Sequence, residues 1–160
     1  MTAETITFAL GCFWDPDAKF GVLDGVLTTQ VGYCGGTHPP NPTYHSIGDY
    51  TESVQIVFDP SRISFRQLLD CYNNWHVRNT DRTRSQYAGA IFYHNKQQYE
   101  EIRQVNIEHI RIDLFKEFYP AEEYHQKYSL KRAILETELF GRKEDWETKE
   151  KEMLTKLNGF

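Results

Sequence analysis

The sequence is poor in cysteine, and its few cysteines are not arranged as a disulfide framework. It has three, Cys12, Cys34 and Cys71, an odd number at wide spacing. Small secreted domains usually carry an even set of closely spaced cysteines. We therefore expect reduced thiols in a cytoplasmic protein. Any special role for a cysteine is then expected to be chemical.

Several other features are missing as well. No apolar run approaches the ~20 residues of a membrane span, and residues 1–4 lack the basic and apolar regions of a signal peptide. There are 18 Lys and Arg against 23 Asp and Glu, so the net charge of −5 argues against nucleic-acid binding. The six histidines show no metal-ligand spacing with the cysteines. We expect a monomer with no metal and with no nucleic-acid or membrane partner.

The chain has 160 residues, which fits one domain with a sizeable core. Aromatic residues make up 14% of it, so the core is expected to depend on them. We predict a single domain over 1–160, with a core over about 5–128 and a charged helical tail over about 129–160.

Alternating apolar residues predict strands, and helix-period apolar residues predict helices. One such helical face is expected from Phe65, Leu68, Leu69, Tyr72 and Trp75. Asp15-Pro16 is typical of an N-cap and first helical position, and Ser64 with Gln67 matches a capping box. In chain order, we predict a strand at 5–10, a helix at 15–23, a strand at 26–33, a strand at 52–58, a helix from 64, a strand at 87–93, a helix capped by Asn95 and a short strand near 110–114.

The first 93 residues thus give the order β-α-β-β-α-β. This order is typical of an α+β fold, the ferredoxin-like split βαβ core of two layers, here with a helical C-terminal extension. In that arrangement the first strand lies between the third and the fourth. One edge of the sheet would then collect Cys12, Glu52, Tyr87 and Cys34.

Cys12 lies between a strand end and a predicted helix N-terminus. The helix dipole there favours an anion, so we expect the thiol pKa to fall below about 8.5. Phe13 and Trp14 could wall an apolar pocket beside the thiol, and desolvation of Glu52 would raise its pKa and make it a proton donor. The alternatives are a buried core cysteine, two core aromatics and a glutamate facing water.

Several segments together resemble the A-type peptide methionine sulfoxide reductases (MsrA). The resemblance covers about residues 5–128 and is carried by Gly11-Cys12-Phe13-Trp14, Val31-Gly32-Tyr33, Gly35-Gly36, Asn41-Pro42-Thr43-Tyr44, Glu52 with Val54 to Pro60, Gln86-Tyr87, Ala90 to Tyr93 and Phe118 to Gln126.

The resemblance implies a thiol-dependent reduction of methionine S-sulfoxide in proteins, peptides or the free amino acid. Cys12 would be the nucleophile that becomes a sulfenic acid, and Phe13 and Trp14 would hold the S-methyl group. Glu52 would protonate the sulfoxide oxygen, to which Tyr44 and Tyr87 would donate hydrogen bonds.

The chain departs from the family pattern in three places. Asp49-Tyr50-Thr51 stands where the family has Gly-His-Ala, and the loop after the second predicted helix lacks the family's aspartate, for which Asp81 is a possible substitute. The tail has no cysteine to resolve a sulfenic acid. Regeneration is then expected from Cys34, from Cys71 or from an external thiol such as thioredoxin, glutaredoxin or glutathione, with no bound cofactor.

Three functions follow as hypotheses. The first is a methionine sulfoxide reductase that repairs oxidised proteins. The second is a related thiol enzyme with another sulfoxide substrate, since the altered loops form the substrate rim. The third is a non-catalytic module that binds oxidised methionine.

Overall fold

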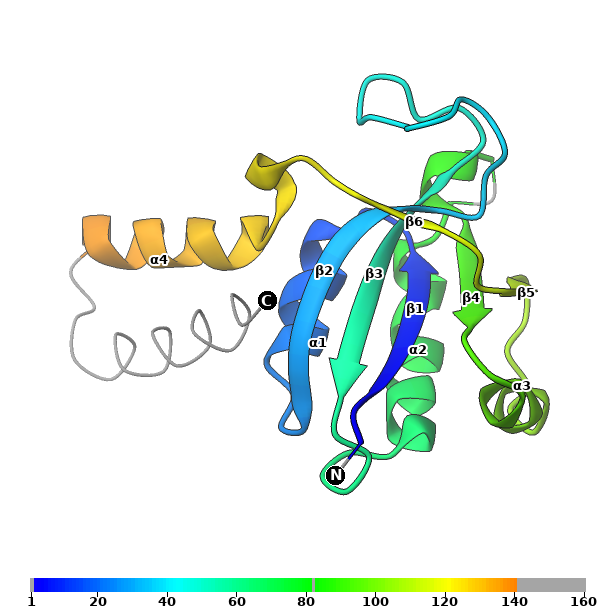
Figure 1. Cartoon of the computed structure of the whole chain (residues 1–160). Coiled ribbons are helices and arrows are strands. Elements are labelled where there is room, and N and C mark those ends of the chain that lie inside the picture. The colour runs from blue at the N-terminus through cyan, green and yellow to red at the C-terminus, as the bar shows by residue number, and fades with distance from the viewer. Residues whose placement is uncertain (1, 82, 141–160) are drawn as a thin grey trace.

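The structure, a computed structural model, describes residues 2–81 and 83–140. It is an α+β fold built on one curled six-stranded sheet in the order β5-β4-β1-β3-β2-β6 (Figure 1). The strands are β1 (Glu4–Leu10), β2 (Val26–Cys34), β3 (Thr51–Phe58), β4 (Gly89–Tyr93), β5 (Arg111–Leu114) and β6 (Phe118–Pro120). The helices are α1 (Trp14–Gly21), α2 (Phe65–Asn79), α3 (Lys96–Arg103) and α4 (Tyr128–Phe140), with short 3₁₀ turns η1 (Ser85–Tyr87) and η2 (Glu123–His125).

The predicted neighbours of the first strand are confirmed. β1 pairs antiparallel with β3 on one side and with β4 on the other, and β2 pairs antiparallel with β3. β1 and β2 therefore run in the same direction. Their carboxyl ends lie at the same end of the sheet, the upper end in Figure 1, below the loop that connects β2 to β3.

Two outer strands extend the sheet beyond the expected four. β5, near the predicted position, pairs in parallel with β4, so the sheet is mixed. β6 pairs antiparallel with the end of β2 and was not predicted, because three residues are too few to show an alternating pattern. Its position next to β2 brings the segment after it to the end of the sheet that carries Cys12.

Helices α1 and α2 cover one face of the sheet (Figure 1), with α1 against β2 and β3, and α2 against β1. Between the layers lies the main core, formed largely by aromatic and aliphatic side chains. The predicted apolar face of α2 is confirmed, since Phe65, Leu68, Leu69 and Tyr72 are buried and Trp75 packs against the core. A second, smaller cluster occupies the other face of the sheet and contains Ala9, Cys34, Ala90 and Phe92.

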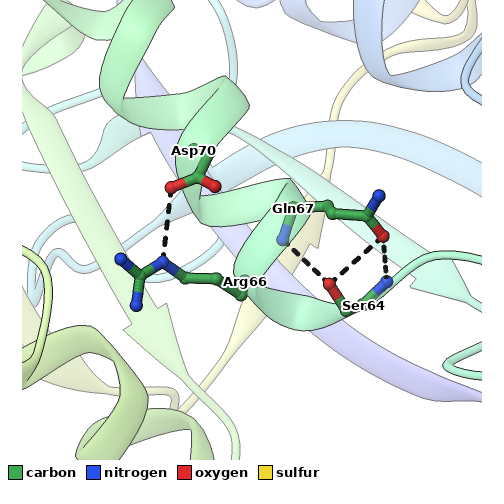
Figure 2. Close-up of polar contacts among 4 residues, drawn as sticks. All are labelled: Ser64, Arg66, Gln67 and Asp70. Carbon is green, nitrogen blue, oxygen red and sulfur yellow. Dashed lines mark hydrogen bonds and ion pairs between the residues drawn. The ribbon is translucent and has the colours of Figure 1, made fainter.

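The predicted capping box at the start of α2 is confirmed (Figure 2). The hydroxyl of Ser64 accepts from the N–H of Gln67 at 3.1 Å, and the N–H of Ser64 donates to Oε1 of Gln67 at 2.8 Å. Arg66 and Asp70 add an exposed ion pair one turn apart. Asn95 caps α3 as predicted, accepting from the N–H of Gln98.

The predicted start of α1 is wrong. The helix begins at Trp14 with Phe13 as its N-cap residue, so Asp15 and Pro16 lie inside the first turn. Pro16 is tolerated there because the first turn has no intrahelical acceptors for its N–H groups. The helix also ends at Gly21 rather than near residue 23, and Gly25, at φ +94°, marks the turn into β2.

Two further boundaries differ. The fourth strand begins at Gly89, and Tyr87 belongs to the turn η1 before it. In the tail, α4 covers the first part of the predicted helical segment, and residues 141–160 lie outside the described residues. Within the described part of the chain, no helix is long and apolar enough to cross a membrane.

Candidate active site

Cys12 lies in the short connection between β1 and α1. Gly11 between them adopts φ +90°, a conformation that glycine accepts without strain. This turn leaves Cys12 exposed, whereas Leu10 and Phe13 on either side are buried. The chain thus presents a thiol at the surface on a short connection held by buried residues.

The expected fall in the pKa of Cys12 is wrong for the free protein. Partial burial of the thiol raises its pKa above the usual value, and the nearby carboxylates of Glu52 and Asp15 raise it further. A hydrogen bond with the backbone of Trp14, at the helix N-terminus, acts in the opposite direction but is outweighed. The sequence pattern identified the helix end, but it did not show the desolvation.

Glu52 is almost completely buried at the start of β3, with 1% of its surface exposed. Its Oε1 accepts from the N–H of Phe13 at 3.2 Å, and its Oε2 accepts from Nε2 of Gln86 at 2.5 Å. Burial raises the pKa of Glu52, although both hydrogen bonds favour the charged form. The expected shift is therefore confirmed, and it favours a protonated carboxyl group beside the thiol.

Tyr87 and Tyr44 lie next to these two groups. The hydroxyl groups of the two tyrosines share a hydrogen bond. Burial raises the pKa of Tyr87 to about 12, and the negative charges of Glu52 and Cys12 contribute. Tyr87 therefore keeps its proton near neutral pH. The structure brings together all four groups that the sequence predicted: thiol, carboxyl and two phenols.

Phe13 and Trp14 lie on the same side of the sheet and differ in exposure. Phe13 is buried against the ring of Tyr33 at 5.9 Å between centroids. Trp14 is half-buried, and its indole stacks on Tyr128 at 3.9 Å and 18°. Phe13 thus packs in the main core. Trp14 has one ring face covered by Tyr128 and is not fully buried.

Sequence reasoning assigned no role to Glu122, which the structure places beneath the site. Its carboxylate accepts from the hydroxyl of Tyr33 at 2.9 Å and from the N–H of Tyr44 at 3.2 Å. These bonds, with one from Tyr124, outweigh partial burial and lower the pKa of Glu122. A charged Glu122 therefore fixes the backbone at Tyr44. Its place in the segment of residues 118–126, already part of the resemblance, was the available signal.

The altered residues around Glu52 also have defined contacts. Thr51 is buried, and its hydroxyl donates to the carbonyl oxygens of Gln86 and Ala88, both at 3.2 Å. It thereby ties β3 to the turn that carries Tyr87. Asp49 accepts from the N–H groups of Thr37 and His38, closing the loop between β2 and β3. Asp81, the possible substitute for the family's loop aspartate, accepts from the N–H and the hydroxyl of Thr83 within its own loop.

Cys34 is at the expected end of β2 but on the opposite face of the sheet. Tyr33 packs in the main core, and the next side chain, Cys34, belongs to the smaller cluster behind it. Its Sγ donates to the carbonyl oxygen of Glu117 at 3.2 Å, and burial raises its pKa to about 12. Cys71 packs against the main core on α2, and burial raises its pKa as well.

The described residues contain no cluster of three or more His, Cys, Asp or Glu side chains that could hold a metal ion. The site brings together a surface thiol, a buried carboxyl group whose pKa is raised and two phenols. An α+β fold with these groups is suited to a thiol enzyme in which a carboxylic acid could act beside the nucleophile.

The family follows from comparison with known proteins. Residues 4–156 match the family model of the peptide methionine sulfoxide reductases. The chain belongs to this family.

Two relatives illustrate the match. A Drosophila melanogaster protein named peptide methionine sulfoxide reductase is 42% identical over 141 residues, which cover 81% of this chain and 57% of that protein. The chain thus spans little more than half of the length of that relative. The MsrA of Methanococcoides burtonii is 39% identical over 145 residues, 78% of this chain and 94% of its own.

Solved structures agree. Methionine sulfoxide reductase A of Corynebacterium diphtheriae gives a TM-score of 0.68 at 28% identity, covering 81% of this chain and 74% of that one. Reduced Mxr1 from Saccharomyces cerevisiae gives a TM-score of 0.66 at 27% identity, and the match covers 81% of this chain and 85% of Mxr1.

Proposed function

We propose that the chain reduces methionine S-sulfoxide, in oxidised proteins, in peptides or as the free amino acid, with Cys12 as the nucleophile. The observation that carries this assignment is the pairing of an exposed thiol with the buried carboxyl of Glu52, whose pKa is raised. A sulfoxide oxygen is a poor leaving group until it is protonated. A neutral carboxylic acid beside the nucleophile supplies that proton.

In the proposed reaction, Cys12 attacks the sulfoxide sulfur as a thiolate. Glu52 gives its proton to the sulfoxide oxygen, and the hydroxyl groups of Tyr44 and Tyr87 donate hydrogen bonds to it. Phe13 and Trp14 hold the S-methyl group. Overall, the thiol and the sulfoxide become a sulfenic acid on Cys12 and methionine, so the oxygen atom moves from one sulfur to the other.

An external thiol is the proposed reductant. A thiolate attacks the sulfenic acid to give a mixed disulfide and water, and a second thiol releases Cys12 as the free thiol. Cys34, the internal alternative, is buried on the other face of the sheet with a pKa of about 12, which argues against it. Thioredoxin, glutaredoxin and glutathione all fit this role. Mxr1 has also been solved in complex with Trx2.

We also propose that the core is a ferredoxin-like split βαβ unit within a single domain. The order β4-β1-β3-β2, with α1 and α2 as the two connections on one face, supports this description. Strands β5 and β6 are then additions to the four-stranded unit within the core over about 5–128, and helix α4 begins the tail.

The test is a single turnover with a methionine S-sulfoxide peptide and no reductant, followed by intact-mass analysis. We expect one methionine per protein and a gain of one oxygen on Cys12. A loss of two hydrogens mapped to Cys12 and Cys34 would indicate a disulfide between them. Cys34, and not an external thiol, would then be the group that reduces the sulfenic acid. No methionine and no mass change would contradict the reductase assignment. Turnover in this assay would also exclude a module that only binds oxidised methionine.

A further inference from the structure

His125, in the turn η2, has an unusual environment beside the proposed substrate wall. Only 1% of its surface is exposed, and its ring packs against those of Phe13 and Tyr44 at centroid distances of 5.2 and 4.5 Å. Its Nδ1 lies 2.9 Å from the indole Nε1 of Trp14. Its Nε2 is buried without a hydrogen-bond partner among the described residues. His125 thus contacts three of the residues assigned to the substrate.

The indole partner determines where the imidazole proton lies. An indole N–H can only donate, so Nδ1 of His125 must be the acceptor and carries no proton. A neutral imidazole then carries its single proton on Nε2. Burial, the largest effect, lowers the pKa of His125, which agrees with a neutral ring near pH 7.

The segment that carries His125 is anchored to both β2 and α1. Just after it, the side chain of Gln126 bonds to both the N–H and the carbonyl of Val31 in β2, at 3.0 and 2.9 Å. The N–H of Lys127 donates to the buried carboxyl of Asp17 in α1 at 2.8 Å. Since Trp14 begins the same helix, α1 and the segment 125–127 are joined at two points.

We propose that His125 is a positioning residue that fixes the indole of Trp14 in the substrate-binding wall through its Nδ1 acceptor. This inference rests on the proposed function, because it gives Trp14 a role at the sulfoxide. Stacking on Tyr128 covers one face of the indole but gives its N–H no acceptor. The bond to Nδ1 supplies that acceptor and a directional contact before the substrate arrives, and such preorganisation lowers the cost of binding.

Two substitutions separate the acceptor from simple packing. His125→Asn places an amide oxygen near the position of Nδ1 and keeps an acceptor for the indole. His125→Gln carries its amide near the position of Nε2 and loses that acceptor. We expect His125→Gln to raise KM for a methionine S-sulfoxide peptide by about tenfold, the order of one lost buried hydrogen bond, with a smaller change in kcat. His125→Asn should recover most of the wild-type KM.

A double-substitution cycle tests whether the effect passes through Trp14. In a Trp14→Phe background the indole N–H is absent, so His125→Gln should add little to KM. An equal rise in KM for His125→Asn and His125→Gln would overturn the proposal. The proposal would also be overturned if His125→Gln raised KM in the Trp14→Phe background as much as it does in the wild-type protein.

A spectroscopic measurement on the wild-type protein tests the hydrogen bond without any activity assay. The ¹⁵N shifts of His125 should report an unprotonated Nδ1 and a protonated Nε2, and the Trp14 indole N–H, assigned by its loss in Trp14→Phe, should be protected from exchange. A proton on Nδ1, or a rapidly exchanging indole N–H, would overturn the positioning role. Failure of the single-turnover assay alone would overturn the proposed function and leave the hydrogen bond established.

Discussion

The two cysteines at the upper end of the sheet, Cys12 and Cys34, occupy opposite environments. Cys12 lies in a turn, exposed, on the side that also holds Glu52 and Tyr87. Cys34 is the last residue of β2, and strand alternation turns it to the face behind, where it is buried at 1% exposure. The two thiols lie at the same end of the sheet, yet they differ in solvent access, in the charged side chains nearby and in the neighbouring acids.

The same comparison shows why a sheet edge is a coarse guide to a site. Strand order brings residues to the same end of the sheet, but the period of two decides which face they share. Tyr33 and Cys34 are adjacent in sequence and lie in different clusters. Only the first is linked to the active-site side, through Glu122 and Tyr44.

Substitution of the thiols is the strongest test of this difference. Cys12→Ser should abolish methionine formation, since a hydroxyl is a far weaker nucleophile than a thiolate. Cys34→Ser should leave the first turnover intact, because Cys34 lies on the other face. Both are measured as methionine released per protein without reductant. If Cys34→Ser lost the first turnover while its thermal unfolding stayed unchanged, the proposed difference in role between Cys12 and Cys34 would be wrong.

A matched pair of acids gives the next largest effect. Glu52→Gln should slow the chemical step by roughly 10²–10⁴-fold, the range for a lost general acid. Glu117→Gln is the control, because this side chain accepts from the hydroxyl of Tyr119 and lines the cavity that Cys34 also lines. Single-turnover rates compare the two. Equal rates in Glu52→Gln and wild type would show that Glu52 is not the proton donor.

Alkylation sharpens the contrast between the thiols. Iodoacetamide at pH 8 should modify Cys12 faster than Cys34 by on the order of 100-fold or more, since Cys34 is buried and its pKa is about 12. Peptide mapping over time gives both rates, and an unfolded sample in denaturant should show similar rates for the two. Comparable alkylation rates for Cys12 and Cys34 in the folded protein would mean that the reagent reaches Cys34 on its face of the sheet.

The smallest expected effect concerns the charge of Asp15. Its carboxylate disfavours the Cys12 thiolate and so raises the pKa of the thiol. Asp15→Asn should therefore lower that pKa, and the pH profile of Cys12 alkylation should move to lower pH. Added salt should shrink the difference between variant and wild type, because an exposed charge is screened.

The matched control is Asp24→Asn. Asp24 is an exposed aspartate shortly after α1, and it forms an ion pair with Arg62. The substitution should leave the profile in place. A shift of the Asp15→Asn profile to higher pH would contradict the sign of the electrostatic effect.

The local signals in the sequence were reliable where short-range physics dominates. The capping box at Ser64, the cap at Asn95 and the apolar face of α2 are confirmed, because each depends on residues within a few positions. The start of α1 was misplaced by such a rule: Asp15-Pro16 has the composition of a helix start, but the chain enters the helix two residues earlier, from the turn at Gly11. Strand β6 was missed because its pairing with β2 is a long-range contact.

For the site, the predicted groups were found together, but their electrostatics were only half foreseen. The raised pKa of Glu52 followed from burial, as expected. The thiol pKa of Cys12 moved opposite to the prediction, because desolvation and two carboxylates outweigh the helix end. Glu122 and His125 were visible in the family-like segment, yet their partners Tyr33 and Trp14 lie about 90 and 110 residues away in sequence.

By itself, the sequence determined the family, the candidate reactive groups and the order of the strands and helices in the first 93 residues, since motifs and periodicity are local properties of the chain. Only the tertiary structure decided which face each group occupies, how far Glu52 is desolvated and what holds Trp14 in place. These depend on contacts between distant segments and on the exclusion of water, which no local pattern encodes.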